Sequence, residues 1–325
     1  MNIPAVASGA PLVREPLATG RLPALSSRES PAMFDPAQLA ALAAIHRRGT
    51  FEAAAADLHV TPSAISQRIK ALEEAAGTLL LSRGQPCTAT QAGLRLVRHH
   101  DEIALLTRQL AEDLPGLTPG PATLRIAVNA DSLATWVVPA LAATEGLLFH
   151  LVIDDQDVSQ DWLKRGEVVA AITAHPGPLQ GCDTIPLGAL RYRPTASPGF
   201  AARWFPAGPT PGALARAPAL VYSREDRLQH RWTEALTGRR LTMPAHMLAS
   251  SQGFVDAALA GLGWGMNPEP LVVAHIAAGR LVDLAPLRPL DVALHWQFTR
   301  LAAPTLAPLT KAIRAEAART LVPAP

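Results

Sequence analysis

Cysteines are scarce in this sequence, and long apolar runs are absent from it. The two cysteines, Cys87 and Cys182, cannot build a disulfide framework, which indicates free thiols in a reducing cytoplasm. Neither belongs to a C-x-x-C or lies beside an H-x-x-H, so no metal site is expected. No stretch of 18 or more apolar residues occurs, so we expect neither a membrane-spanning helix nor a membrane partner.

Lysine is also rare: only three of the 29 basic residues are lysines, and the formal net charge is +2. A total this close to neutral does not decide whether nucleic acid is a partner, because the placement of charge decides it. With 325 residues, 49% hydrophobic and 17% charged, the chain is globular and long enough for two or more domains. Residues 1–32 have no helical or strand period. We interpret them as a disordered tail, or as the product of a start codon upstream of a true start at Met33.

Residues 33–90 predict three short helices followed by a hairpin. Asp35-Pro36 is a typical N-cap and first-turn pair for the first helix. The turn at 59–60, between the second and third helices, is tight, which is typical of a helix-turn-helix. Segments 79–83 and 88–90 predict a small β-hairpin wing.

The exposed face of the third helix, from Ser63 to about Ala76, carries hydroxyls, an amide and cations. Such groups form hydrogen bonds with base edges and phosphates in a major groove. The segment 58–98 has five bases and two acids, a local charge of +3 against +2 for the whole chain. An ordinary polar helix face is the alternative interpretation. The residues predicted to contact double-stranded DNA, at a promoter or operator, are Thr61, Pro62, Ser63, Ser66, Gln67, Arg68 and Lys70, with Arg83 in the wing.

A long linker helix is predicted over residues 91–114. Its apolar stripe has a seven-residue rhythm with one intermediate position, which suits a seam between helices of two protomers. We therefore expect a homo-oligomer, a dimer or a tetramer; packing of the stripe on its own domain is the alternative. The Pro- and Gly-rich segment 115–121 is the clearest linker in the chain. The stripe consists of Leu96, Ile103, Leu106 and Leu110.

Residues 122–325 alternate short apolar strands with helices. This alternation favours an α/β domain with a mostly parallel sheet. The chain is expected to cross into a second lobe near 192–194 and to return between 281 and 298. Two lobes with a crevice between them are typical of small-molecule binding. The first predicted strands lie at 124–128, 149–153 and 168–172.

The segment from Phe51 to Glu73 resembles the winged helix-turn-helix of the LysR-type transcriptional regulators. Gly77, Leu80-Leu81-x-Arg83 and Thr90-x-Ala92-Gly93 stand where that family has its wing and the start of its linker helix, with Leu81 in place of the usual Phe. The resemblance covers about residues 33–320. It implies a DNA-binding regulator with a two-lobed α/β effector domain like a periplasmic binding protein. RNA polymerase is an implied partner if the protein activates transcription.

Five further segments resemble the ArgP/LysG-like branch of this family, which senses arginine and lysine and controls a basic amino-acid exporter. This resemblance implies that the effector is a basic amino acid such as lysine or arginine. The segments are 66–70, 83–87, 126–136, 165–169 and 250–254.

The turn that follows the strand at 124–128 is the predicted effector site. It leads from a strand end into a helix start, where free backbone N–H groups can receive a carboxylate. Aspartates there could hold an ammonium or guanidinium group, and Trp136 and Trp264 could cover an aliphatic stem. Helix capping is the alternative role for the aspartates, and core packing for the tryptophans. The predicted effector-binding residues are Asn129, Ala130, Asp131, Ser132, Trp136, Asp154 and Asp155, with Ser250, Ser251 and Gln252 closing the site from the second lobe.

No Ser/His/Asp or Cys/His arrangement has a local signature, and Gly261-x-Gly263-x-Gly265 lacks the preceding strand and following helix of a dinucleotide site. We therefore expect no enzymatic activity, no catalytic residues and no cofactor. Two alternatives to a DNA-binding regulator stay open: a small-molecule-binding module that acts through protein partners, and an enzyme that works in the crevice.

Overall fold

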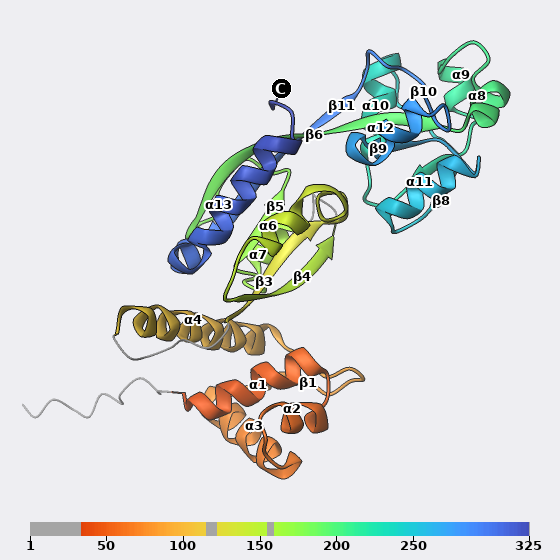
Figure 1. The fold of residues 1–325 in the computed structure, drawn as a ribbon. Helices are drawn as coiled ribbons and strands as arrows, with labels where there is room; N and C mark the ends of the chain where they lie inside the picture. Colours follow the sequence, from red (N-terminus) through yellow and green to blue (C-terminus); the bar gives the residue numbers. More distant parts are fainter. Residues whose placement is uncertain (1–33, 115–121, 155–158, 325) are drawn as a thin grey trace, which may run out of the picture.

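The computed structural model describes residues 34–114, 122–154 and 159–324. The predicted tail at 1–32, the predicted linker at 115–121 and Asp155 lie outside these residues. Figure 1 shows a helical head, a long helix α4 beside it, and a two-lobed α/β body. This is the multidomain α/β architecture that the sequence predicts.

The head contains three helices and a two-stranded antiparallel wing. Helix α1 starts as predicted, since Asp35 Oδ1 accepts a hydrogen bond from the backbone N–H of Ala37 at 2.6 Å. Gly49 ends α1 with a φ of 78°, a left-handed conformation that glycine adopts without steric cost. The inner faces of the helices form a core of their own, which includes Leu42 and Ile65. The elements are α1 (Pro36–Arg48), α2 (Phe51–Asp57), α3 (Pro62–Ala76), β1 (Leu81–Ser82) and β2 (Thr88–Ala89).

Helix α4 (Gln91–Asp113) joins the head to the body. Of its predicted stripe, Leu96 is half-buried and packs against the core of the head. Ile103, Leu106 and Leu110 are 39%, 49% and 58% exposed in the single chain. Apolar side chains at this spacing share one face of a helix, which leaves a surface that a second helix can cover.

One mixed sheet passes through the body in the order β10-β6-β11-β5-β3-β4, with β9 paired to β6. Among its described strands, only β3 pairs in parallel, with β4 and with β5. The predicted mostly parallel sheet is therefore wrong. The long strands β6 and β11 run in opposite directions and make every other pairing antiparallel. The strands are β3 (Ala122–Asn129), β4 (Leu147–Asp154), β5 (Ala170–Thr173), β6 (Cys182–Ala196), β9 (Gly265–Pro268), β10 (Val282–Asp283) and β11 (Leu290–Thr299).

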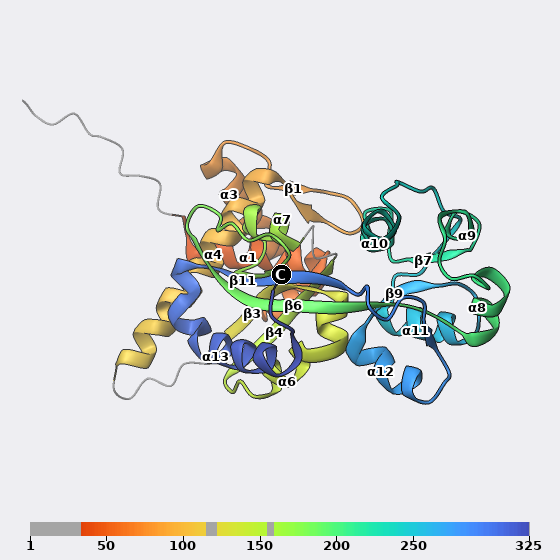
Figure 2. The same ribbon diagram turned by 90° about the horizontal axis from the view of Figure 1, so that it is seen from above.

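Strands β6 and β11 lie side by side and cross from the first lobe into the second, near the predicted crossing points (Figures 1 and 2). The first lobe also holds α5 (Ala130–Ser132), a π-helical turn (Leu133–Val137), α6 (Val138–Ala142), α7 (Ser159–Lys164), a 3-10 turn (Arg300–Ala302) and α13 (Ala303–Thr320). The second lobe holds α8 (Pro198–Trp204), α9 (Pro211–Leu214), β7 (Ala219–Val221), α10 (Leu228–Thr237), β8 (Ala245–Met247), α11 (Ser251–Leu259) and α12 (Glu269–Ala277). In the described part of the chain, none of the helices is long and apolar enough to cross a membrane.

Candidate functional sites

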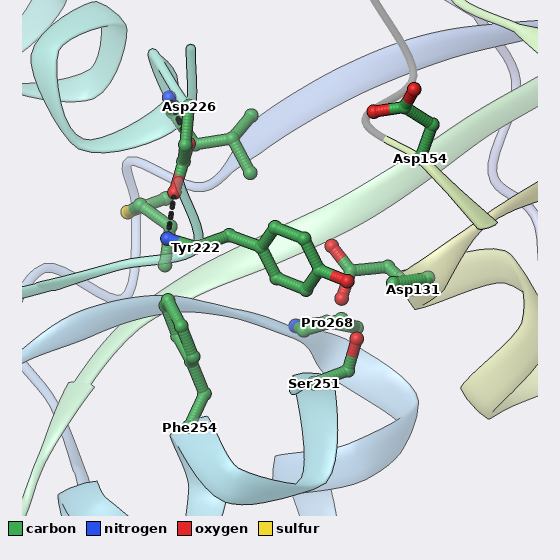
Figure 3. Close-up of a pocket in the computed structure, with 10 residues that line it drawn as sticks. Asp131, Asp154, Tyr222, Asp226, Ser251, Phe254 and Pro268 are labelled. Atoms are coloured by element: carbon green, nitrogen blue, oxygen red, sulfur yellow. Dashed lines mark hydrogen bonds between the residues drawn. The ribbon is translucent and has the colours of Figure 1, made fainter. Parts of the chain in front are cut away.

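A small pocket lies between the two lobes (Figure 3). The first lobe contributes the start of α5, directly after β3, and the end of β4. The second lobe contributes the segment between β7 and α10, the start of α11 and strand β9. Segments far apart in the sequence therefore share one site. Its lining residues are Ala130, Asp131, Asp154, Tyr222, Asp226, Leu228, Ser251, Phe254, Met266 and Pro268.

The parallel pairing of β3 and β4 brings two carboxyl groups to one wall of this pocket. Asn129 at the end of β3 is in register with Asp154 at the end of β4, and Asp131 follows two residues later. Ligands of α/β sheets typically bind outside the carboxyl ends of parallel strands. Trp162 orients one of these groups, because its Nε1 donates a hydrogen bond to Asp154 Oδ2 at 2.9 Å.

The carboxyl group of Asp131 has a perturbed pKa. Burial raises this pKa, the hydroxyls of Ser251 and Tyr192 oppose the increase, and the negative charge of Asp226 adds to it. The Tyr192 hydroxyl donates to Asp131 Oδ2 at 2.8 Å. Ser251 Oγ faces the same carboxyl group in Figure 3, yet it makes no hydrogen bond of normal geometry with the described residues. A ligand can therefore supply both a cation for the carboxylate and a partner for this hydroxyl.

The described residues that line the pocket include three aspartates and no basic side chain. Asp226 is buried and accepts hydrogen bonds from the backbone N–H groups of Tyr222 at 2.8 Å and Leu228 at 2.9 Å, so it also holds the segment after β7 in place. Buried carboxylates that share a site repel one another unless an opposite charge compensates them. The electrostatics of the pocket favour a cationic ligand.

The pocket has a volume of about 20 Å³, which is room for about one water molecule. Figure 3 shows why: the ring of Tyr222 extends across the site, and its hydroxyl ends beside Asp131. A ligand of amino-acid size therefore enters only when Tyr222 turns aside or the two lobes separate.

The polar face of α3 is the candidate nucleic-acid interface. Thr61 also caps the helix, because its Oγ1 accepts a hydrogen bond from the backbone N–H of Ala64 at 3.2 Å. Glu73 holds the wing against α3, because its Oε1 accepts from the backbone N–H of Leu80 at 2.8 Å. The predicted DNA-contacting residues are exposed, apart from the half-buried Arg68; the exposed ones are Thr61, Pro62, Ser63, Ser66, Gln67, Lys70 and Arg83.

Comparison with known proteins identifies the two parts of the chain in which these candidate sites lie. The family profile described as "Bacterial regulatory helix-turn-helix protein, lysR family" matches residues 36–94, and the one described as "LysR substrate binding domain" matches residues 118–318. The chain belongs to the LysR family. The family of the two matched profiles consists of transcriptional regulators, so this LysR-family chain is a DNA-binding regulator and not an enzyme, as predicted.

The relatives of this LysR-family chain include regulators named ArgP and LysG. The HTH-type transcriptional regulator ArgP of Pseudomonas aeruginosa is 42% identical over 295 residues, which cover 89% of this chain and 98% of that protein. The crystal structure of ArgP from Mycobacterium tuberculosis has a TM-score of 0.75 and 42% identity, and the match covers 90% of this chain and 100% of that one. Full-length LysG from Corynebacterium glutamicum with bound effector Arg has a TM-score of 0.64 and 34% identity, and the match covers 89% of this chain and 100% of that one. The resemblance to the ArgP/LysG-like branch is confirmed.

The predicted effector residues of this LysR-family chain do not all reach the pocket. Asn129 and Ser132 are 1% and 0% exposed and are not part of its lining; their side-chain polar atoms have no hydrogen-bond partner among the described residues. Ser250 caps α11, and Gln252 is exposed on the same helix. The predicted residues that line the pocket are Ala130, Asp131, Asp154 and Ser251.

Trp136 and Trp264, which were predicted to cover the aliphatic stem of the effector, do not line the pocket. Both side chains lie in the main hydrophobic core, where they are 1% and 0% exposed. Trp264 packs against Trp232, with ring centroids 5.3 Å apart. The large apolar rings stabilise the fold by burial, as core-packing residues do.

Tyr222 and Asp226 line the pocket but are not among the residues predicted from the sequence. Both follow the buried strand β7, as Asp154 follows β4. An apolar run that ends in polar residues was the available signal. It does not say, however, that the end of β7 faces the ends of β3 and β4 across the crevice.

Proposed function

We propose that this LysR-family regulator works in the cytoplasm, binds DNA through α3 and the wing, and responds to lysine or arginine in the pocket between its lobes. The observation that carries the effector assignment is the lining of three carboxyl groups without a basic side chain among the described residues. The structure of LysG with bound effector Arg supports the same class of ligand.

The pocket offers partners for both ends of a basic amino acid. Asp131 and Asp154 are placed for its ammonium or guanidinium group, which carboxylates bind through charge-assisted hydrogen bonds. The α-carboxylate would meet Ser251 Oγ and the backbone N–H groups at the start of α11, where the helix dipole favours negative charge. Phe254 and Tyr222 would then flank the aliphatic stem.

Ligand entry changes the relation between the lobes, because a 20 Å³ pocket must widen to hold an amino acid. The ligand shifts the protein between two states only as far as it binds them differently. Movement of the first lobe can reach the head through α4. Gln109 Nε2 of α4 donates to the backbone carbonyl of Leu301 at 3.2 Å, and Asp101 of α4 pairs with Arg47 of the head.

The exposed face formed by Ile103, Leu106 and Leu110 supports a homo-oligomer, a dimer or a tetramer, in which two α4 helices cover one another. Paired protomers would present two α3 helices to a pseudo-palindromic site. Control of an amino-acid exporter, and contact with RNA polymerase in the case of an activator, stay predictions. So does the division into a DNA-binding unit at 33–90 and an effector unit at 122–325.

Calorimetry with lysine, arginine and the uncharged analogue norleucine tests the effector assignment. We expect heat with at least one basic amino acid and none with norleucine; no heat with either basic amino acid would remove the assignment. Ser251→Ala should weaken binding, whereas Gln252→Ala, an exposed neighbour on α11, should not.

A gel shift with DNA from upstream of the protein's own gene, with and without lysine or arginine, tests DNA binding. Retained lysine binding without any shift would favour the alternative, a small-molecule-binding module that acts through protein partners.

A further inference from the structure

A second and larger cavity lies between the head, α4 and the first lobe, well away from the effector pocket. Its volume is about 740 Å³, within the range of small-molecule sites. Arg47 and Arg48 come from the end of α1, Arg108 from α4 and Arg125 from β3; His100 of α4 and His150 of β4 also line it. Three parts of the chain that have different tasks therefore meet around one space.

The described residues of the cavity wall include more arginines than carboxylates. Four arginines line it, against two aspartates among the described residues. Both aspartates are already engaged, Asp57 with Arg48 and Asp101 with Arg47. The two pairs leave the charge of Arg125 without an acidic partner on the cavity wall.

Arg125 is half-buried, and its Nε has no hydrogen-bond partner among the described residues. Glu167 is the acid whose charge most strongly opposes the decrease in the pKa of Arg125 that burial causes. Its Oε1 already pairs with Nε of Arg165 at 2.6 Å. Burial, and then the charges of Arg125 and Arg47, lower the pKa of His150. A buried Nε–H without a hydrogen-bond partner is costly, and an oxyanion matches the planar donors of a guanidinium in pairs.

We propose that this cavity is an anion-binding site for a phosphate-bearing small molecule, which ties the DNA-binding head to the first lobe of the sensor. Arginines on opposite walls suit a ligand with several phosphate oxygens, and the volume admits one as large as a nucleotide. The cavity is separate from the predicted DNA-contacting face. Its wall includes the end of α1, which packs with α3 and with α4, and the predicted DNA-contacting residues of α3 are exposed apart from the half-buried Arg68. Figure 1 shows α3 on the side of α1 away from the body. Because the cavity joins head and sensor, its ligand would change how strongly effector binding is transmitted to the head.

Calorimetry on the full-length protein at constant ionic strength tests the proposal with inorganic phosphate, pyrophosphate and ATP. We expect pyrophosphate or ATP to bind more tightly than inorganic phosphate, since two phosphate groups can reach arginines on two walls. Equal affinity for all three probes would identify the free phosphate ion as the ligand. A preference for ATP would identify a phosphorylated metabolite as the ligand. No binding of any of the three would overturn the proposal.

Arg125→Gln should weaken the binding of the best probe at least tenfold and abolish the rise in unfolding temperature that the probe causes. Arg108→Gln, on another wall, is expected to do the same if Arg125→Gln fails to fold. Arg231→Gln is the matched control, because Arg227, Arg231 and Arg240 surround a separate basic hollow of about 380 Å³ on the second lobe. Loss of binding in the control, or unchanged binding in both cavity variants, would refute the site.

Discussion

The replacement Asp131→Asn separates the two effects of the half-buried Asp131 carboxylate in the effector pocket. Asparagine keeps an oxygen that can accept the 2.8 Å hydrogen bond from Tyr192 and removes only the charge. Loss of one member of a buried charge pair typically costs about 2–5 kcal/mol. Asp154 still lines the pocket in the variant, so we expect the lower end of that range. About 2 kcal/mol corresponds to a roughly 30-fold weaker Kd for lysine or arginine.

The same replacement should stabilise the ligand-free protein at neutral pH. Burial raises the pKa of Asp131 in the folded state, so ionising this group costs more in the folded than in the unfolded chain. Wild-type protein therefore loses stability relative to the variant as pH rises through the raised pKa. Below the usual pKa of 3.8 the group is protonated in both states, and the difference should vanish.

The Kd of lysine should also depend on pH in the wild type. A cation binds the ionised carboxylate, so affinity should increase as pH rises towards the raised pKa of Asp131 and level off above it. Calorimetry across this range, with thermal unfolding of the free proteins at each pH, measures both effects. Asp256→Asn, an exposed aspartate of α11 outside the pocket, is the matched control. An Asp131→Asn protein that binds lysine within threefold of wild type and is no more stable would refute the electrostatic account.

Three further predictions concern the head and α4. Gln67→Ala should weaken specific DNA binding by about 1–3 kcal/mol and relax base preference, because an exposed amide on α3 is suited to read base edges; unchanged operator footprints would exclude α3 as the reading helix. Leu106→Glu with Leu110→Glu should dissociate the oligomer, because it places charges on the exposed apolar face of α4; ultracentrifugation that still shows the wild-type mass would place the seam elsewhere. Glu73→Ala should lower the unfolding free energy by about 1–2 kcal/mol, because it removes the acceptor for the backbone N–H of Leu80; denaturant unfolding measures this, and an unchanged midpoint would show that the bond contributes nothing.

Local sequence signals predict the helices of the head well. Asp35 and Gly49 mark the two ends of α1, and each acts on the backbone within three or four residues. The ends of β3 and β4 are also predictable from local sequence, because an apolar run stops at a polar turn in each case. Asp131 and Asp154 could therefore be named as candidate ligand residues before their neighbours were known.

Pairings between distant segments could not be read in this way. The direction of β6 and β11 depends on how the chain crosses between the lobes, which makes the sheet mixed. Trp136 has an aromatic ring that could stack on a ligand. Its place in the core depends instead on what packs around the helix that carries it.

The sequence by itself determined the family, predicted the recognition helix and marked two of the three carboxyl groups in the pocket, because short motifs and strand ends are local properties. The tertiary structure alone decided that Asp226 and Tyr222 complete that pocket, and that Arg125 meets Arg47 across a cavity. The reason is physical: charges interact strongly only at short range, and only the folded chain brings residues far apart in the sequence within that range.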